Sequence, residues 1–234
     1  MEINMLSRYK AVFFDVGGTL LRVEPSVGEV YAKHARSFGF KGSGEELNSI
    51  FQDEWDKLGG IESLGKKSGE KEEKKFWRNL VFQVFKPSGG LNDFEHYFET
   101  VYEAFSRKDH WHVFDDVIGS GIFDKLKKYG VVLGVVSNWD SRLHAILKST
   151  GLANYFDFIL TSAEVGCAKP DETIFFEALR RSRVNSQEAC HIGDEPRADV
   201  QGANNAGIDA ILIDRKGKYE KEDFIMARSF LELL

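Results

Sequence analysis

The stretch AVFFDVGGTLL at residues 11–21 decides the fold of this chain. With the preceding lysine it opens on a short apolar run, 10–14, which is typical of a strand buried inside a sheet. The run stops at DVGGT, 15–19, where two adjacent glycines predict a tight turn. The first strand therefore ends on a carboxylate, that of Asp15.

From about residue 115 onward, short apolar runs alternate with helical patterns. Strands that alternate with helices indicate a parallel sheet covered by helices on both faces, which is a Rossmann-like α/β core. The run 10–14 has the same character and belongs to this sheet. The further predicted strands are 131–136, 157–160, 189–192 and 209–213. The predicted helices are 115–129, 140–150, 171–182, 198–206 and 224–233.

Residues 22–113 have a different texture, because helical patterns follow one another there and no strand is predicted. Leu47, Phe51 and Trp55 recur at four-residue steps, as one buried helix face requires. We therefore predict two domains, an α/β core of 1–21 and 114–234 and an inserted all-helical cap domain of 22–113. The helices predicted in the cap lie near 26–39, 43–58, 71–86 and 91–107.

The composition excludes several classes of protein. Hydrophobic residues make up 42% of the 234 residues, which is enough for a sizeable core, and the net charge of −6 disfavours binding to nucleic acid. The apolar runs are far shorter than the ~18 residues that span a bilayer. Two cysteines make neither a disulfide scaffold nor a four-cysteine metal site. We expect a cytoplasmic protein, a monomer or weak dimer, without nucleic-acid or membrane partners.

Four predicted strands are each followed by residues that can carry chemistry. Ligands of parallel sheets bind beyond the carboxyl ends of the strands, so these residues are expected to meet in one site. Taken singly, each has a structural explanation as a turn, helix-capping or solvated residue. Taken in order along the chain, they point to a functional site. They are Asp15, Ser137, Asn138, Lys169, Asp194 and Asp199.

The segments that hold these residues are AVFFDVGGTLL, GVVSNWD, AKPDETIF and HIGDEPRADVQGANNAG. In order and spacing they resemble the four motifs of the haloacid dehalogenase-like hydrolase superfamily, in the branch with a helical cap inserted after the first strand. The resemblance covers the whole chain. It implies a Mg²⁺-dependent hydrolase of the phosphatase kind that acts on small phosphorylated metabolites, with the cap as a lid that excludes water.

The resemblance also implies how the nucleophile and the metal are held. Asp15 is expected to attack phosphorus and form an aspartyl-phosphate intermediate. Asp15 and Asp194, with the backbone carbonyl of Gly17, are expected to bind Mg²⁺, which offsets the repulsion between two anions. Asp199 is expected to act at the metal through water or by orienting the other ligands.

The remaining motif residues are expected to bind the phosphoryl group. Lys169 would neutralise charge in the transition state. Ser137 and the backbone amide of Asn138 would donate hydrogen bonds to phosphate oxygens. Gly18 and Thr19 would allow the close backbone approach that the turn needs.

The chain departs from the superfamily pattern at Gly17. Phosphatases of the superfamily place a second aspartate there as general acid and base, and the loss of a general acid typically costs about 10²–10⁴ in rate. Turnover is then slow, the substrate has a good leaving group, or another residue replaces the acid. The candidates for a replacement are Glu24, His34 and Asp140.

Two alternatives to a phosphatase follow from the same departure. In the first, the protein is a degenerate member of the superfamily that binds a phosphorylated ligand or a protein partner without catalysis. In the second, it is a 2-haloacid dehalogenase. Dehalogenases of the superfamily also lack the second aspartate, because a halide leaves without a proton.

Overall fold

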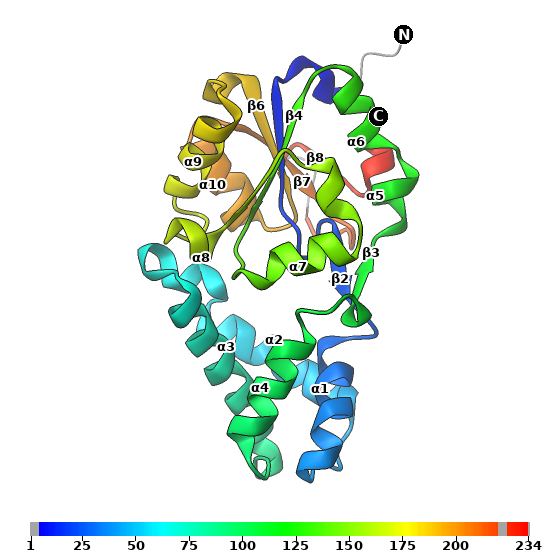
Figure 1. The fold of residues 1–234 in the computed structure, drawn as a ribbon, viewed down its shortest axis with the longest axis vertical. Helices are drawn as coiled ribbons and strands as arrows, with labels where there is room; N and C mark the ends of the chain where they lie inside the picture. The colour runs from blue at the N-terminus through cyan, green and yellow to red at the C-terminus, as the bar shows by residue number, and fades with distance from the viewer. Residues whose placement is uncertain (1–4, 220–223, 234) are drawn as a thin grey trace.

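The computed structural model describes residues 5–219 and 224–233, and its centre is a six-stranded sheet (Figure 1). The strand order is β5-β4-β1-β6-β7-β8, and every neighbouring pair is parallel. β1 lies inside the sheet, between β4 and β6. The strands are β1 Ala11–Phe14, β4 Val132–Ser137, β5 Phe158–Thr161, β6 Ala189–Gly193, β7 Asp209–Ile213 and β8 Met226–Ala227.

Helices cover both faces of this sheet, and the α/β fold class predicted from the sequence is confirmed. Alternate side chains of β1 point to opposite faces, so Val12 and Phe14 enter one apolar cluster while Ala11 and Phe13 enter another. On the Val12 face lie α5 Asp115–Gly119, α6 Ile122–Lys128 and α7 Arg142–Ser149. On the other face lie α9 Thr173–Ser182, the π-helical turn η8 Pro196–Gln201 and α10 Gly202–Asn205.

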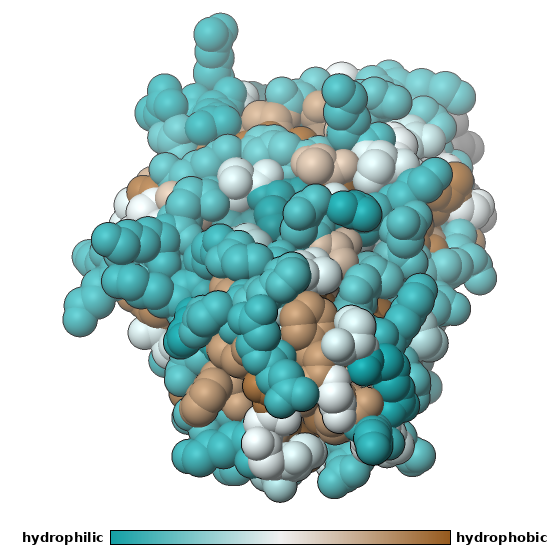
Figure 2. Space-filling model, turned by 60° about the horizontal axis from the view of Figure 1, so that its bottom comes forward, coloured by the Kyte–Doolittle hydropathy of each residue, from teal (hydrophilic) through white to brown (hydrophobic). Residues whose placement is uncertain are grey.

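Four helices form a separate layer beside the carboxyl ends of the strands, drawn in blue to green below the sheet in Figure 1. We call this layer the helical insert, and its side chains form an apolar cluster of their own. Seen from the insert, the surface is mostly hydrophilic with scattered apolar groups (Figure 2). The helices are α1 Val27–Ala35, α2 Gly44–Leu58, α3 Glu70–Phe85 and α4 Phe94–Ala104.

A short two-stranded ribbon joins the insert to the core, although the sequence predicts no strand in 22–113. The chain leaves the core through β2, Leu21–Val23, and returns through β3, Trp111–Val113, which pairs antiparallel with it. Each strand has three residues, which is too short for a period to show in the sequence. The pairing fixes the two connections side by side.

Two further predictions are wrong in detail. The predicted helix 224–233 is instead the edge strand β8 and a 3₁₀ turn, η9 Phe230–Leu233, with Phe230 buried against the core. The predicted helix 115–129 is broken in two, because Gly121 has a left-handed φ of 64°. No helix within 5–219 and 224–233 is long and apolar enough to cross a membrane.

A buried carboxyl group links the insert to the core. Glu73 of α3 is fully buried, and Ser162, the first residue of α8 Ser162–Val165, donates a hydrogen bond to it at 2.6 Å. Ser68 is a second donor to the same carboxyl oxygen. The Ser162 hydroxyl in turn accepts the N–H of Trp139 at 2.9 Å. Burial raises the pKa of Glu73 to about 7.

We predict that Phe14→Ala lowers the free energy of unfolding by about 3–5 kcal/mol, because it leaves a cavity in the core. Phe14 is fully buried, and its ring centroid lies 5.4 Å from that of Phe123 and 6.1 Å from that of Phe230. Urea unfolding followed by circular dichroism measures the loss. The control is Phe176→Ala on α9, where the side chain is 48% exposed and the change should stay within about 1 kcal/mol. Equal losses in both variants would contradict the packing described here.

We also predict that Glu73→Gln becomes more stable relative to the wild type as pH rises from about 5 to 8. The ordinary pKa is 4.5 and the folded one about 7, so between these values the unfolded chain loses a proton that the native protein keeps. The Glu73 contribution to stability therefore falls as pH rises through this window, by at most about 3 kcal/mol, and is constant outside it. Urea unfolding at several pH values measures the difference, with exposed Glu45→Gln as control. A pH-independent difference would rule this out.

Candidate active site

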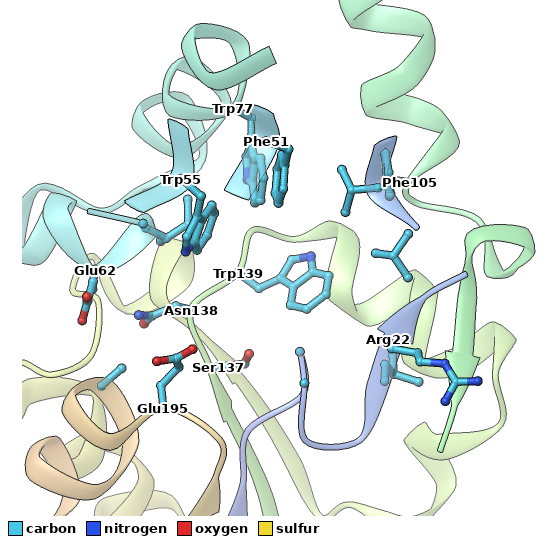
Figure 3. A pocket seen from close by; sticks show the side chains of 18 of the residues that line it. Arg22, Phe51, Trp55, Glu62, Trp77, Phe105, Ser137, Asn138, Trp139 and Glu195 are labelled. Carbon is cyan, nitrogen blue, oxygen red and sulfur yellow. The ribbon is translucent and has the colours of Figure 1, made fainter. Parts of the chain in front are cut away.

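A cavity of about 550 Å³ lies between the helical insert and the carboxyl ends of the strands (Figure 3). The core supplies Asp15 after β1, Ser137 at the end of β4 and Asp194 after β6. The insert supplies the opposite wall, with side chains from all four of its helices and from the segment that follows α2. The cavity thus lies where the strand ends were expected to gather polar groups.

Asp15 is held in one orientation by two donors. Ser137 Oγ donates to its Oδ1 at 2.8 Å, and Lys169 Nζ donates to the same oxygen at 2.7 Å. The backbone N–H of Asp15 donates to Ile192 O on β6 at 2.9 Å, which continues the sheet pairing to the nucleophile position. Its side chain is almost buried at the floor of the cavity.

Lys169 is the central cation of the site. Its side chain is fully buried, and Nζ donates to Asp15 Oδ1, to Asp199 Oδ1 at 2.5 Å and to the carbonyl of Val136 at 3.0 Å. Burial alone would lower the pKa of Lys169, but Asp15 and Asp199 raise it above its ordinary value. The ammonium group is therefore charged throughout the physiological range, and its three protons all have acceptors.

Asp199 is fixed by three neighbours. Besides Lys169, it accepts a hydrogen bond from the backbone N–H of Glu195 at 3.0 Å and lies 2.8 Å from Nε2 of His191. Burial alone would raise the pKa of Asp199, but Lys169 and His191 bring it below its ordinary range. His191 was not among the sequence candidates; the available signal is a lone imidazole inside the apolar strand β6.

Carboxylate oxygens of Asp15, Asp194 and Asp199 all lie within 4.8 Å of one another. Burial raises the pKa of Asp194 well above its ordinary value, and repulsion from Asp15 and Asp199 adds to the effect. Burial also raises the pKa of Asp15, and Lys169 opposes this only in part. Three carboxylates around one ammonium leave an excess of negative charge, so the hard oxygen donors present fit a divalent cation such as Mg²⁺.

The glycine turn after Asp15 brings its backbone against Asp194. Thr19 Oγ1 donates to Asp194 Oδ1 at 3.1 Å. Gly18 has a φ of 76°, and a Cβ there would lie 2.0 Å from Asp194 Oδ2, so only glycine fits. Gly17 differs, because its φ is not left-handed and a Cβ would lie 3.4 Å from Cζ3 of Trp139, an ordinary contact distance.

Asn138 ties together two of the loops that surround the site. Its Nδ2 donates to the carbonyl of Lys169 at 3.0 Å, and its Oδ1 accepts the N–H of Lys169 at 2.7 Å. The amide side chain therefore positions the segment that carries the buried lysine.

The predicted residues come together, while the three candidate replacement acids do not. Among the described residues, Glu24, His34 and Asp140 are absent from the cavity lining, and Asp140 is buried in an ion pair 2.7 Å from Arg142. Two acidic residues that the sequence candidates omitted do line it, Glu62 of the insert and Glu195 (Figure 3). The predicted residues that line the cavity are Asp15, Gly17, Gly18, Ser137, Asn138, Lys169, Asp194 and Asp199. Thr19 lies outside the lining and donates a hydrogen bond to Asp194.

This fold and this arrangement of acids and lysine define a class of hydrolase. Residues 9–207 match the family model of the haloacid dehalogenase-like hydrolases, and the chain belongs to that family. Within it, the chain is similar to haloacid dehalogenase-like hydrolase domain-containing protein 3 of Mus musculus, with 34% identity over 204 residues that cover 86% of this chain and 80% of the mouse protein. The form DVGGT at 15–19 also resembles that group.

Solved structures with the same fold include enzymes of two kinds. A HAD phosphatase from Thermococcus onnurineus is 28% identical, with a TM-score of 0.68 and coverage of 96% of this chain and 95% of its own. A 2-haloacid dehalogenase from Pseudomonas syringae pv. Tomato DC3000 is also 28% identical, with a TM-score of 0.63 and coverage of 96% of each chain. The sequence identity to the phosphatase equals that to the dehalogenase, so the reaction that this chain catalyses has to be argued from the residues of its site.

We predict that Lys169→Met lowers the free energy of unfolding by about 3–5 kcal/mol at pH 7 in the presence of a chelator, because it leaves Asp15 and Asp199 buried without their cation. The matched control is Lys66→Met, which removes an exposed ammonium 3.7 Å from Asp171 and should cost less than about 1 kcal/mol. Urea unfolding measures both. A loss for Lys169→Met no larger than that of the control would show that the buried charges need no such partner.

Proposed function

We propose that the protein is a Mg²⁺-dependent phosphatase that hydrolyses small phosphate monoesters through an aspartyl-phosphate intermediate. The observation that carries this proposal is the Asp15 carboxylate, oriented by Lys169 and Ser137 beside Asp194 in a cavity between the core and the helical insert. A small substrate suits a site of this size under a lid.

In the first step, an oxygen of Asp15 attacks phosphorus and the P–O bond to the leaving group breaks, with the electron pair departing on that oxygen. Both hydrogen bonds to Asp15 reach Oδ1, so Oδ2 is the oxygen placed for attack. In the second step, water attacks phosphorus and displaces the Asp15 carboxylate. Inorganic phosphate is released and the carboxylate is restored.

The other site residues counter the negative charge of the phosphoryl group. Lys169 holds a permanent positive charge beside the reacting oxygens. The backbone N–H of Asn138 would donate to a phosphoryl oxygen, near the turn formed by Gly18 and Thr19. The single proton of the Ser137 hydroxyl goes to Asp15 Oδ1 in this structure, so Ser137 would bind the phosphoryl group only by turning away from Asp15.

The carboxylates of Asp15 and Asp194, with the carbonyl of Gly17, would hold Mg²⁺, which supplies positive charge that reduces repulsion between nucleophile and substrate. Asp199 has a different role, because Lys169, His191 and a backbone N–H already occupy its oxygens. It is a positioning residue that orients Lys169.

We predict that Mg²⁺-dependent phosphate release from an aryl phosphate falls by about 10⁴-fold or more in Asp15→Asn, because the amide cannot act as nucleophile. A colorimetric phosphate assay with and without a chelator measures the loss. Asp124→Asn on α6, an exposed position, is the control and should retain activity. Activity that survives Asp15→Asn would remove the mechanism.

Gly17 favours a second candidate function, binding of a phosphorylated ligand without turnover, because the position lacks a general acid. We predict that Gly17→Asp raises turnover of an alkyl phosphate about 10²–10⁴-fold. Its backbone accepts a side chain, so the variant is expected to fold. A phosphate-release assay on the wild type and the variant measures the change in turnover. Unchanged turnover in a variant that is as stable as the wild type would contradict the explanation that the protein lacks a general acid. Halide release from a 2-haloacid without metal would instead establish a dehalogenase.

A further inference from the structure

Beyond the carboxylates, the cavity is walled by aromatic side chains. All four tryptophans of the chain line it, and each is only partly buried, so their rings offer apolar surface to a bound molecule. A solvated cavity for polar metabolites would not need this surface. The aromatic residues of the lining are Tyr31, Phe51, Trp55, Trp77, Phe98, Tyr102, Phe105, Trp111 and Trp139.

The rings come from both sides of the cavity. On the insert, the Trp55 ring packs against those of Phe51 and Trp77, with centroid distances of 6.0 and 5.6 Å and interplanar angles of 28° and 33°. On the core side, the Trp139 indole projects into the space below these rings (Figure 3). Its partner Trp111 on β3 lies 5.0 Å away, centroid to centroid. A flat molecule held between the two sets would contact aromatic faces on both sides.

Trp139 also borders the position where a general acid is missing. Its Cζ3 lies 3.4 Å from the site of a Cβ on Gly17, two residues after the nucleophile. Next to Asp15, the leaving group therefore meets an indole ring instead of a proton donor. This arrangement suits an apolar leaving group that departs without a proton.

Leaving-group acidity separates the substrates that such a site can hydrolyse. A phenolic hydroxyl has a pKa of about 10, whereas water, and alcohols of similar acidity, lie near 16. A phenolate therefore leaves as an anion far more readily than an alkoxide. The lack of a general acid at Gly17 therefore slows the hydrolysis of alkyl phosphates severely and that of aryl phosphates only slightly.

Two acidic residues at the edge of the site further restrict the class of substrate that can bind. Glu62 and Glu195 line the cavity near Asn138. On that side of the cavity their carboxylates repel a second anionic group of a substrate, such as that of a bisphosphate or a phosphorylated acid. The lining also holds Arg22 and Arg142, which are paired with Glu24 and Asp140. A monoester whose only charge is the phosphoryl group avoids this repulsion.

We propose that the substrates are phosphate monoesters of planar aromatic hydroxyl compounds, an inference that rests on the phosphatase function proposed above. Asp15 takes the phosphoryl group as the P–O(aryl) bond breaks, and the electron pair leaves on the phenolate oxygen. Water then attacks phosphorus and releases phosphate, and its proton balances the phenolate. Trp55 and Trp139 hold the aromatic ring and determine specificity.

The first experiment measures binding apart from turnover. Because the four tryptophans all line the cavity, intrinsic fluorescence reports its occupancy directly. The probes are phenylphosphonate, cyclohexylphosphonate and methylphosphonate, titrated into the wild-type protein with Mg²⁺, since their P–C bond is not hydrolysed. We expect the phenyl compound to bind about tenfold or more tighter than the methyl compound and tighter than the cyclohexyl one.

The second experiment separates ring recognition from leaving-group chemistry. Phenyl phosphate has an aromatic ring and a good leaving group, benzyl phosphate has an aromatic ring and a poor leaving group, and cyclohexyl phosphate has a saturated ring and a poor leaving group. We expect kcat to be highest for phenyl phosphate, and KM to be low for both aromatic compounds. Trp139→Leu should raise KM for phenyl phosphate about tenfold, Trp139→Phe should restore it, and Trp55→Leu gives a second variant on the opposite wall. Phe82→Leu, exposed on α3 outside the cavity lining, is the control.

The outcomes distinguish the two proposals. Phosphate release through Asp15 with equal KM for aromatic and saturated esters, and equal binding of the three phosphonates, would overturn the aromatic substrate class and leave the phosphatase function standing. Tight phenylphosphonate binding without turnover of any ester would overturn the phosphatase function, and the substrate class with it. Fast turnover of aryl esters with weak turnover of benzyl and cyclohexyl esters, together with selective binding, supports both.

Discussion

The Lys169 ammonium, buried between Asp15 and Asp199, is the interaction on which the rest of the site depends. An unpaired charge in this position would cost several kcal/mol, so the chain has to bring both carboxylates to it. Asp15 arrives at the end of β1 and Asp199 in the turn after β6, while Asn138 holds the backbone of Lys169 in place. The site therefore forms only when the sheet folds correctly, because the strand order brings both carboxylates to Lys169.

The sheet could be predicted from the sequence because β1, Ala11–Phe14, is buried on both faces and reads as an unbroken apolar run. The ribbon strands and β8 could not, because each has only two or three residues and owes its pairing to tertiary neighbours. The segment near Phe230 has an apolar pattern that also suits a helix. Its actual form depends on contact with Phe14, which lies far away in sequence.

The strand-end residues of the site were predictable because parallel topology places the carboxyl ends of neighbouring strands together. His191 and Glu62 were not. His191 is one polar residue inside an apolar strand, and its role appears only when Asp199 is seen 2.8 Å away. Glu62 belongs to the helical insert, whose orientation over the sheet has no signature in the sequence. The aromatic lining has the same origin, since rings spaced along α2 and α3 could equally be packing residues of the insert.

Gly17 and Trp139 are best understood as a pair. The backbone at Gly17 accepts a side chain, so the glycine is not required by the turn, in contrast to Gly18. A carboxyl group at that position would lie beside the indole ring of Trp139, in surroundings that solvate a charge poorly. An acid at position 17 would therefore lie against an apolar wall next to the nucleophile. In this chain the Trp139 indole lies there and no acid is present. The hydrolysis rate depends less on a proton from an acid as the leaving group becomes a more stable anion.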